Sequence, residues 1–72
     1  MQQFGEKVRT LRKKQGLSLR KLASMLGLAT HSHLDRIEKG ENKPSADLIL
    51  TIAIFFGVTT DQLMRDELEL DE

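Results

Sequence analysis

The 72-residue sequence contains no cysteine, a single proline and no apolar run long enough to cross a membrane. The absence of cysteine excludes disulfides and thiolate metal sites. The longest apolar stretch, residues 48–58, contains a threonine and a glycine and is much shorter than the ~20 residues that a transmembrane helix needs. The N-terminal residues also lack the apolar core of a secretory signal peptide. Together, these absences predict a soluble, cytoplasmic protein with no membrane partner.

Signatures of catalysis and of metal binding are missing as well. The sequence has no thiol nucleophile, no Gly-rich phosphate loop and no pattern of a catalytic triad, so we expect no enzyme activity and no catalytic residue. His31 and His33 are the only histidines. On a helix, positions i and i+2 point ~200° apart, so these two side chains diverge. The sequence therefore predicts neither a metal site nor a cofactor.

The net charge of zero conceals a sharp division of charge along the chain. Residues 1–44 contain ten lysines and arginines and four acids, a net charge of +6, whereas residues 45–72 contain one arginine and seven acids, a net charge of −6. This asymmetry predicts a basic pole and an acidic pole; the alternative is chance clustering of solvated charges. A chain of this length forms one domain and buries only ~60% of its unfolded surface, so pairing with a second copy would stabilise it.

The apolar spacing and the cap residues predict an all-α domain of five helices. Ser18, Ser45 and Thr59 are expected N-caps, and Gly27 and Gly57 are expected helix ends. The predicted helices cover residues 4–15, 18–26, 30–39, 46–56 and 60–66. The domain therefore spans residues 1–66, and residues 67–72 form an acidic C-terminal tail, for which an edge strand, an extended arm and a disordered end all remain open.

Residues 18–39 contain the second and third predicted helices, which are separated by a tight turn. The third helix has only two large apolar residues, Leu34 and Ile37, and both fall on one side. A helix of this kind packs by a narrow apolar stripe and offers hydrogen-bonding side chains to another molecule. Two helices in this arrangement are typical of a helix-turn-helix motif.

The order and spacing of ten residues resemble the phage-repressor-like (XRE) helix-turn-helix family. They are Leu22, Ala23, Gly27, Leu34, Ile37, Glu38, Gly40, Lys43, Pro44 and Ser45. The resemblance extends from about Phe4 to Met64, and it implies a lambda-repressor-like domain that acts as a sequence-specific transcriptional regulator. Two features depart from the family pattern: the turn from Gly27 to Thr30 is one residue longer than usual, and Leu19 occupies a position that often holds glutamine.

The same resemblance assigns roles to individual residues. The base-contacting positions fall on His31, Ser32, His33 and Arg36, for which the alternative is exposed polar residues without a partner. From their positions at the start of the second helix and after the third, the candidates for phosphate contacts are Ser18, Arg20, Lys21, Asn42 and Lys43; the alternative for each basic residue is an ordinary solvated charge, but phosphate better explains them as a group. Arg12 and Glu38 match an inner ion pair that orients the first helix against the third in this family.

The fourth helix has more apolar residues than its contact with the other helices requires. Leu48, Ile54 and Phe55 lie off its expected core-facing side. If exposed, they would form one apolar patch with residues near the C-terminus, namely Leu63, Met64, Leu68 and Leu70. We expect this patch to be the interface of a homodimer. Such a dimer would place its two recognition helices ~34 Å apart over a palindromic operator. The alternative is that the C-terminal tail of the same chain covers Phe55.

The predicted partners are therefore double-stranded DNA and a second copy of the chain, with RNA polymerase as a further partner if the protein activates transcription. A protein-binding adaptor or an antitoxin with the same fold is the alternative function. An adaptor needs apolar anchors on its recognition helix, whereas this helix carries histidine, serine and arginine. The sequence therefore favours DNA as the ligand.

Overall fold

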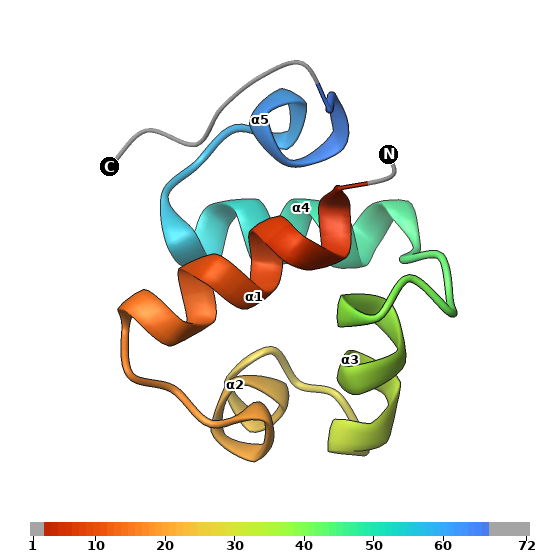
Figure 1. Ribbon diagram of the computed structural model, residues 1–72. Helices are drawn as coiled ribbons and strands as arrows, with labels where there is room; N and C mark the ends of the chain where they lie inside the picture. The colour runs from red at the N-terminus through yellow and green to blue at the C-terminus, as the bar shows by residue number, and fades with distance from the viewer. Residues whose placement is uncertain (1–2, 67–72) are drawn as a thin grey trace.

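The computed structural model describes residues 3–66, and over that range the chain is helical with no strand. Its helices are α1 (Phe4–Lys14), α2 (Leu19–Met25), α3 (His31–Glu38), α4 (Ala46–Phe56) and α5 (Thr60–Met64). In Figure 1, α1 and α4 cross the middle of the molecule, α2 and α3 lie below them, and α5 lies above. The predicted five-helix, all-α fold is confirmed, and each helix ends within two residues of its predicted bounds. The predicted acidic tail lies outside the described residues.

Polar caps fix the beginnings of three helices. The side-chain oxygens of Ser18 and Ser45 accept hydrogen bonds from the backbone N–H groups three residues later, at 3.0 and 3.1 Å. Thr59 and Gln62 form a reciprocal capping box, with each side chain accepting from the other residue's N–H at 2.9 and 3.0 Å. Each of these bonds satisfies an amide that has no partner within its own helix. The caps therefore fix where α2, α4 and α5 begin.

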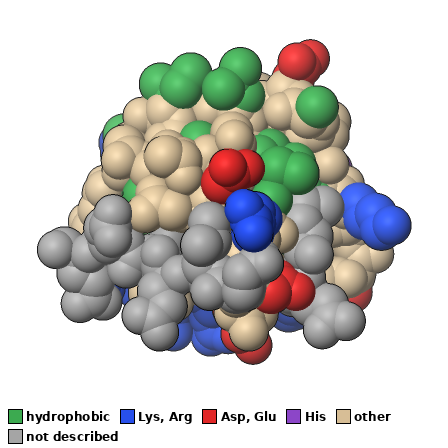
Figure 2. All heavy atoms as spheres, turned by 90° about the horizontal axis from the view of Figure 1, so that it is seen from above, with side chains coloured by type: hydrophobic (Ala, Val, Ile, Leu, Met, Phe, Trp, Pro, Cys, Tyr) green, Lys and Arg blue, Asp and Glu red, His purple; other side chains and the backbone are tan. Residues whose placement is uncertain are grey.

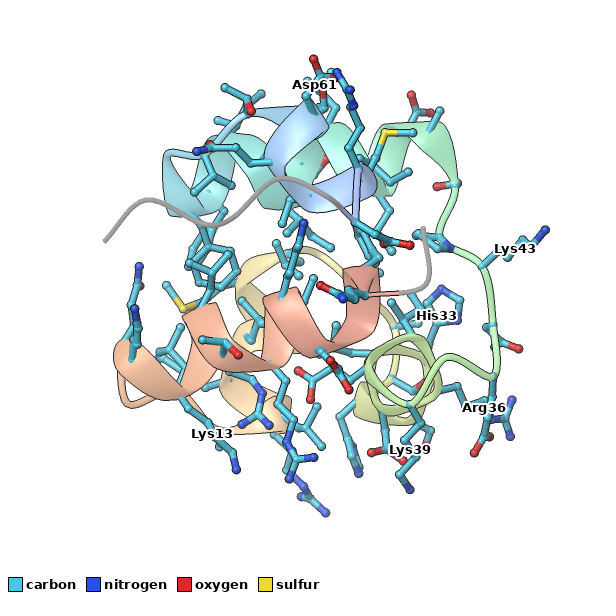
Figure 3. The ribbon with its side chains drawn as sticks, turned by 45° about the horizontal axis from the view of Figure 1, so that its top comes forward. Lys13, His33, Arg36, Lys39, Lys43 and Asp61 are labelled. Atoms are coloured by element: carbon cyan, nitrogen blue, oxygen red, sulfur yellow. The ribbon has the colours of Figure 1, made fainter. Side chains whose placement is uncertain are left out.

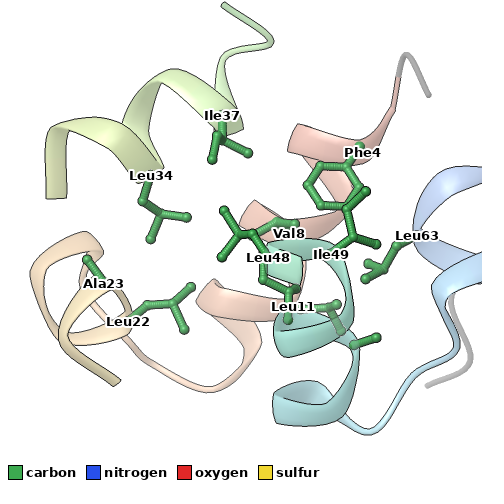
Figure 4. Close-up of a cluster of buried hydrophobic side chains, with 12 residues drawn as sticks. Phe4, Val8, Leu11, Leu22, Ala23, Leu34, Ile37, Leu48, Ile49 and Leu63 are labelled. Carbon is green, nitrogen blue, oxygen red and sulfur yellow. The ribbon is translucent and has the colours of Figure 1, made fainter. Parts of the chain in front are cut away.

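One apolar core joins all five helices, and Figure 4 shows its side chains converging from them. Six of these residues are almost completely shielded from solvent: Val8, Leu22, Leu34, Ile37, Ile52 and Leu63. The remaining members are Phe4, Leu11, Ala23, Leu48, Ile49 and Ala53.

The expected exposure of Leu48 and Leu63 was wrong. Leu48 is 8% exposed and Leu63 is fully buried, and both belong to the core of a single chain. Leu48 follows the cap of α4 and lies next to the side that holds Ile49 and Ile52, so its burial widens the inner side of the helix. Leu63 brings α5 onto the core. Neither side chain is available to a second copy of the chain.

Other apolar side chains do remain on the surface. Ile54 is 72% exposed, Leu50 is 53% exposed and Met64 is 38% exposed. Seen from the α5 side, hydrophobic side chains gather along one edge of the molecule (Figure 2). Phe55 is half-buried: it packs against the core and meets the ring of Phe56 edge to face, with the centroids 5.0 Å apart. Of the other predicted interface residues, Leu68 and Leu70 lie outside the described residues.

Contacts between distant parts of the chain tie α5 to α1. The Lys7 ammonium is buried and donates hydrogen bonds to the backbone carbonyls of Gln62 at 2.5 Å and Arg65 at 2.8 Å. These carbonyls lie at the end of α5, where the helix itself supplies no donor. At the start of α1, the backbone N–H of Gln3 donates to the Asp66 carboxylate at 2.9 Å. The two ends of the described chain therefore complete one another's hydrogen bonds.

Candidate nucleic-acid interface

The α2 helix supplies one side of the candidate interface. Ser18 has extended backbone geometry, and it begins the helix by accepting from an amide in the first turn. Leu22 and Ala23 then face the core, which leaves Arg20 and Lys21 exposed. Because the Ser18 oxygen acts as the acceptor in the cap, its hydroxyl hydrogen is available to a phosphate. The three predicted phosphate-binding residues of this segment thus lie together on its exposed beginning.

The turn between α2 and α3 accommodates its additional residue without separating the helices. Gly27 has a φ of 78°, a left-handed conformation that glycine adopts without steric cost. Leu28 packs against the core, whereas Ala29 is exposed. A shallow surface hollow lies beside the turn and is lined by residues from both helices, including Arg20 and His31. The longer turn therefore adds exposed surface, and α3 remains anchored to the core beside α2.

The α3 helix separates its apolar and polar residues onto opposite sides. Leu34 and Ile37 are buried, and with 3.6 residues per turn the opposite side carries Ser32 at its centre, flanked by Asp35 and Arg36. The two histidines lie at the edges of this outward side; His31 is half-buried, whereas His33 is exposed.

Ser32 and Arg36 therefore share the outward surface of α3, and His31 and His33 lie at its two opposite edges. Their side chains form no hydrogen bond or ion pair within residues 3–66. Serine, histidine and arginine together provide donors and acceptors, and all of these groups are available to an external ligand.

A buried ion pair fixes the inner side of α3. Arg12 donates from Nε to Glu38 at 2.7 Å and from Nη2 at 3.1 Å. The two side chains are only 11% and 4% exposed. A third donor of the guanidinium, Nη1, contacts the carbonyl of Leu17 at 2.9 Å. The predicted pair is present, and it links α1 and the segment that precedes α2 to the end of α3.

Gly5 allows α1 and α3 to approach closely. It is buried where α1 meets the end of α3. A Cβ atom at this position would lie 2.5 Å from the carbonyl oxygen of Ile37 and would also overlap that of Glu38. An alanine would therefore force the two helices apart, although alanine is the better helix former. The position of α3 thus depends on a small residue as well as on the ion pair.

An exposed ion pair on α3 was not assigned from the sequence. The Lys39 ammonium lies 3.0 Å from the Asp35 carboxylate, and both side chains are in contact with solvent. The hydrogen bond and the charge of Asp35 raise the pKa of Lys39. The spacing of four residues between an acid and a lysine is the signal that would have identified this pair.

The loop after α3 contains the remaining predicted phosphate contacts. Lys43 is exposed and Asn42 is half-buried. In Figure 3, Arg36 and Lys43 extend outward on the same side of the molecule, whereas Asp61 lies at its far end. The basic residues assigned to DNA therefore surround α3, and Asp61 lies away from them.

Comparison with known proteins identifies the class. Residues 8–63 match the helix-turn-helix family, and α2 and α3 form the two helices that define the motif. The chain therefore belongs to the XRE-type helix-turn-helix family, as the sequence predicts. Its sequence is 31% identical over 70 residues to the transcriptional repressor RstR of the cryptic phage CTXphi, from Vibrio cholerae.

That alignment covers 96% of this chain but 62% of the repressor, so the chain spans less than two thirds of the relative's length. Within residues 3–66, the helices are too short and insufficiently apolar to cross a membrane.

Proposed function

We propose that this protein is a sequence-specific, DNA-binding transcriptional regulator, and that it acts as a homodimer on a palindromic operator. One observation carries the proposal. Around its outward side, α3 presents four hydrogen-bonding side chains, those of His31, Ser32, His33 and Arg36, that have no partner in residues 3–66, while a buried ion pair and Gly5 fix the helix from behind. A rigid helix with free polar groups near its N-terminus is suited to the major groove.

The side chains on α3 differ in what they select. Arg36 is exposed on the outward side, and an arginine can donate two parallel hydrogen bonds to O6 and N7 of guanine. Ser32, one turn before it, can donate or accept. His31 and His33 approach the DNA from the two edges. We therefore assign the strongest base preference to Arg36.

Phosphate contacts on both sides of α3 would hold the protein in register. Ser18, Arg20 and Lys21 precede or begin α2, and Asn42 and Lys43 follow α3. Contacts of this kind supply half to two-thirds of the hydrogen bonds in protein–DNA complexes and carry no base information directly. Substitutions in this set should therefore weaken binding to every sequence to a similar extent.

Repression by occupancy of a promoter is the proposed mode of action, because it requires no contact other than the one with DNA. The relative from Vibrio cholerae is named as a transcriptional repressor. A bound regulator represses when it covers a promoter, without needing an effector domain. Activation would require a further contact with RNA polymerase.

The homodimer is proposed from the surface of α4. Leu50 and Ile54 are one turn apart, and both are largely exposed. Extended apolar surface is rare on monomeric soluble proteins, and a two-fold axis would bring the same side chains together from both copies. Asp47 and Asp61 are exposed and would lie at the rim. This surface replaces the predicted one that included Leu48 and Leu63.

Selection of bound sites from a random duplex pool tests the proposal. We expect the enriched sites to contain two inverted half-sites about 10 base pairs apart, centre to centre, because two recognition helices on one face of DNA are separated by a helical turn. A parallel selection with Arg36→Ala should lose one preferred base pair in each half-site. A pool without enrichment would contradict DNA recognition and would favour the adaptor or antitoxin. A single unpaired site would contradict the dimer alone.

A further inference from the structure

Two basic side chains on α1 have no role in the interface described above. Arg9 and Lys13 are exposed, and their spacing of four residues places them on the same side of the helix. Neither forms a hydrogen bond or an ion pair within residues 3–66. Both belong to the basic half of the sequence. They are therefore free cations on a helix that packs directly against α3.

The surroundings of Arg9 connect it to both helices of the motif. Arg9 lines a surface hollow together with Leu19, the first residue of α2, and Lys39, which follows α3. The positive charge of Arg9 also lowers the pKa of Lys39, against the larger effect of the hydrogen bond that Lys39 donates to Asp35, so the two cations lie near one another. Figure 3 shows Lys13 and Lys39 extending from the same lower side of the molecule. The basic surface thus continues from α3 onto α1.

We propose that α1 is a third DNA-contacting element, in which Arg9 and Lys13 bind phosphates of the strand that meets the start of α2. The inference deepens the proposed function and rests on it. Four residues of a helix span about 6 Å, and the phosphates of one strand are spaced by about 3.4 Å along the DNA axis. The two side chains are therefore far enough apart to bind separate phosphates of that strand.

Carboxylates in the same hollow affect how strongly Arg9 can bind a phosphate. Glu6 and Asp35 line the hollow together with Arg9. Asp35 is engaged by Lys39, whereas Glu6 forms no ion pair within the described residues. The Glu6 carboxylate would repel a phosphate bound by Arg9. Removing its charge should therefore strengthen DNA binding, and removing the charge of Arg9 should weaken it.

The test compares Arg9→Gln/Lys13→Gln with the parent protein by fluorescence anisotropy. Two duplexes are used: a selected operator and a mixed-sequence duplex of equal length. Each phosphate contact contributes about 0.9 to the slope of log affinity against log salt, so the double substitution should flatten the slope by about 1.8. Between about 50 and 200 mM salt, the parent should therefore lose roughly tenfold more affinity than the variant. The flattening should be equal on both duplexes.

Matched variants separate charge from structure. Arg9→Lys/Lys13→Arg keeps both charges and should retain the parent slope. Arg65→Gln removes a cation at the end of α5 and should also retain it. Glu6→Gln should tighten binding to both duplexes, which provides an independent measurement if the double glutamine variant melts early.

The possible results are distinguishable. If the parent binds its operator and the double glutamine variant has the same slope, or if Glu6→Gln leaves binding unchanged or weaker, the α1 contact is contradicted and the proposed function stands. If the parent binds neither duplex, the proposed function fails and this inference fails with it.

Discussion

The helices α3 and α4 both pack one side against the core, but they differ in how that side is held and in what the other side offers. The inner side of α3 has two large apolar residues and a buried carboxylate that is paired with Arg12. The inner side of α4 is entirely apolar. Outward, α3 offers hydrogen-bonding side chains, whereas α4 exposes Leu50 and Ile54. The difference indicates a polar partner for α3 and an apolar partner for α4.

The largest expected effect comes from removing the polar anchor of α3. Glu38→Ala leaves the Arg12 guanidinium buried without its carboxylate, and breaking a buried pair from one side costs about 3–5 kcal/mol. We expect a large fall in the free energy of unfolding, measured by chemical denaturation. Glu41→Ala, which removes an exposed acid just after α3, is the matched control.

Removing both charges of the Arg12–Glu38 pair should lower the free energy of unfolding much less than removing the charge of Glu38 alone. Arg12→Met/Glu38→Met leaves no unpaired ion, and apolar replacements of buried pairs are often neutral or stabilising. If Glu38→Ala unfolds at the same denaturant concentration as the parent, the ion pair does not hold α3 and the contrast with α4 fails.

The next effect concerns the outward side of α4. Ile54→Glu places a charge at the centre of the proposed dimer surface, where burial of one isoleucine contributes about 1.5–3 kcal/mol. We expect dimer mass in light scattering to fall to monomer mass at micromolar concentration. The fold should persist, because Ile54 is 72% exposed in the single chain. Ile54→Leu should remain dimeric. A dimeric Ile54→Glu variant, or a monomeric parent, would exclude this surface as the interface.

A smaller effect is expected on the outward side of α3. Arg36→Ala should cost about 1–3 kcal/mol of binding free energy at the preferred site and relax the preference at one base pair. Lys43→Ala should weaken binding to all sequences alike and flatten the salt slope by about one unit. The two variants are compared by titrating the operator and its single-base variants at several salt concentrations. Equal losses on every duplex for both variants would mean that Arg36 does not select a base.

The smallest effect is expected at the exposed ion pair. Asp35→Asn removes the carboxylate that raises the pKa of Lys39, so this pKa should move down toward its ordinary value in an NMR titration of the lysine. Many exposed pairs contribute nothing measurable to stability. We therefore expect the midpoint of thermal unfolding to be unchanged, in contrast to the buried pair of the same helix. A clear loss of stability would show that burial is not what distinguishes the two pairs.

The sequence predicted the helices well because their limits depend on local chemistry. Ser18, Ser45 and Thr59 accept hydrogen bonds from residues three positions later, and Gly57 has a left-handed φ of 69°. Ser32 and Arg36 share the outward side of α3, with the two histidines at its edges, for a similarly local reason, namely the helical repeat. The Arg12–Glu38 pair was found through the resemblance to the family, since its partners are 26 residues apart.

The predictions for α4 were weaker because that helix is apolar on nearly every side. When most positions are apolar, periodicity does not decide which of them face inward, and only the packing of the other helices does. Leu48 was therefore placed outside although it is buried, and the exposed Leu50 was overlooked. The burial of Lys7 also depends on tertiary structure, because the carbonyls that receive its hydrogen bonds belong to residues near the other end of the domain.

The Lys7 contacts bear on when the domain can complete its fold during synthesis. They join positions 55 and 58 residues apart, so Lys7 in α1 finds these partners only when α5 has been made. At about 5–20 residues per second, α2 and α3 leave the ribosome seconds before that contact can form. A nascent chain that ends before α5 has the complete helix-turn-helix sequence but lacks Leu63 from its core and leaves the Lys7 ammonium without these acceptors. On the proposed function, we therefore expect DNA binding to appear only once α5 has emerged.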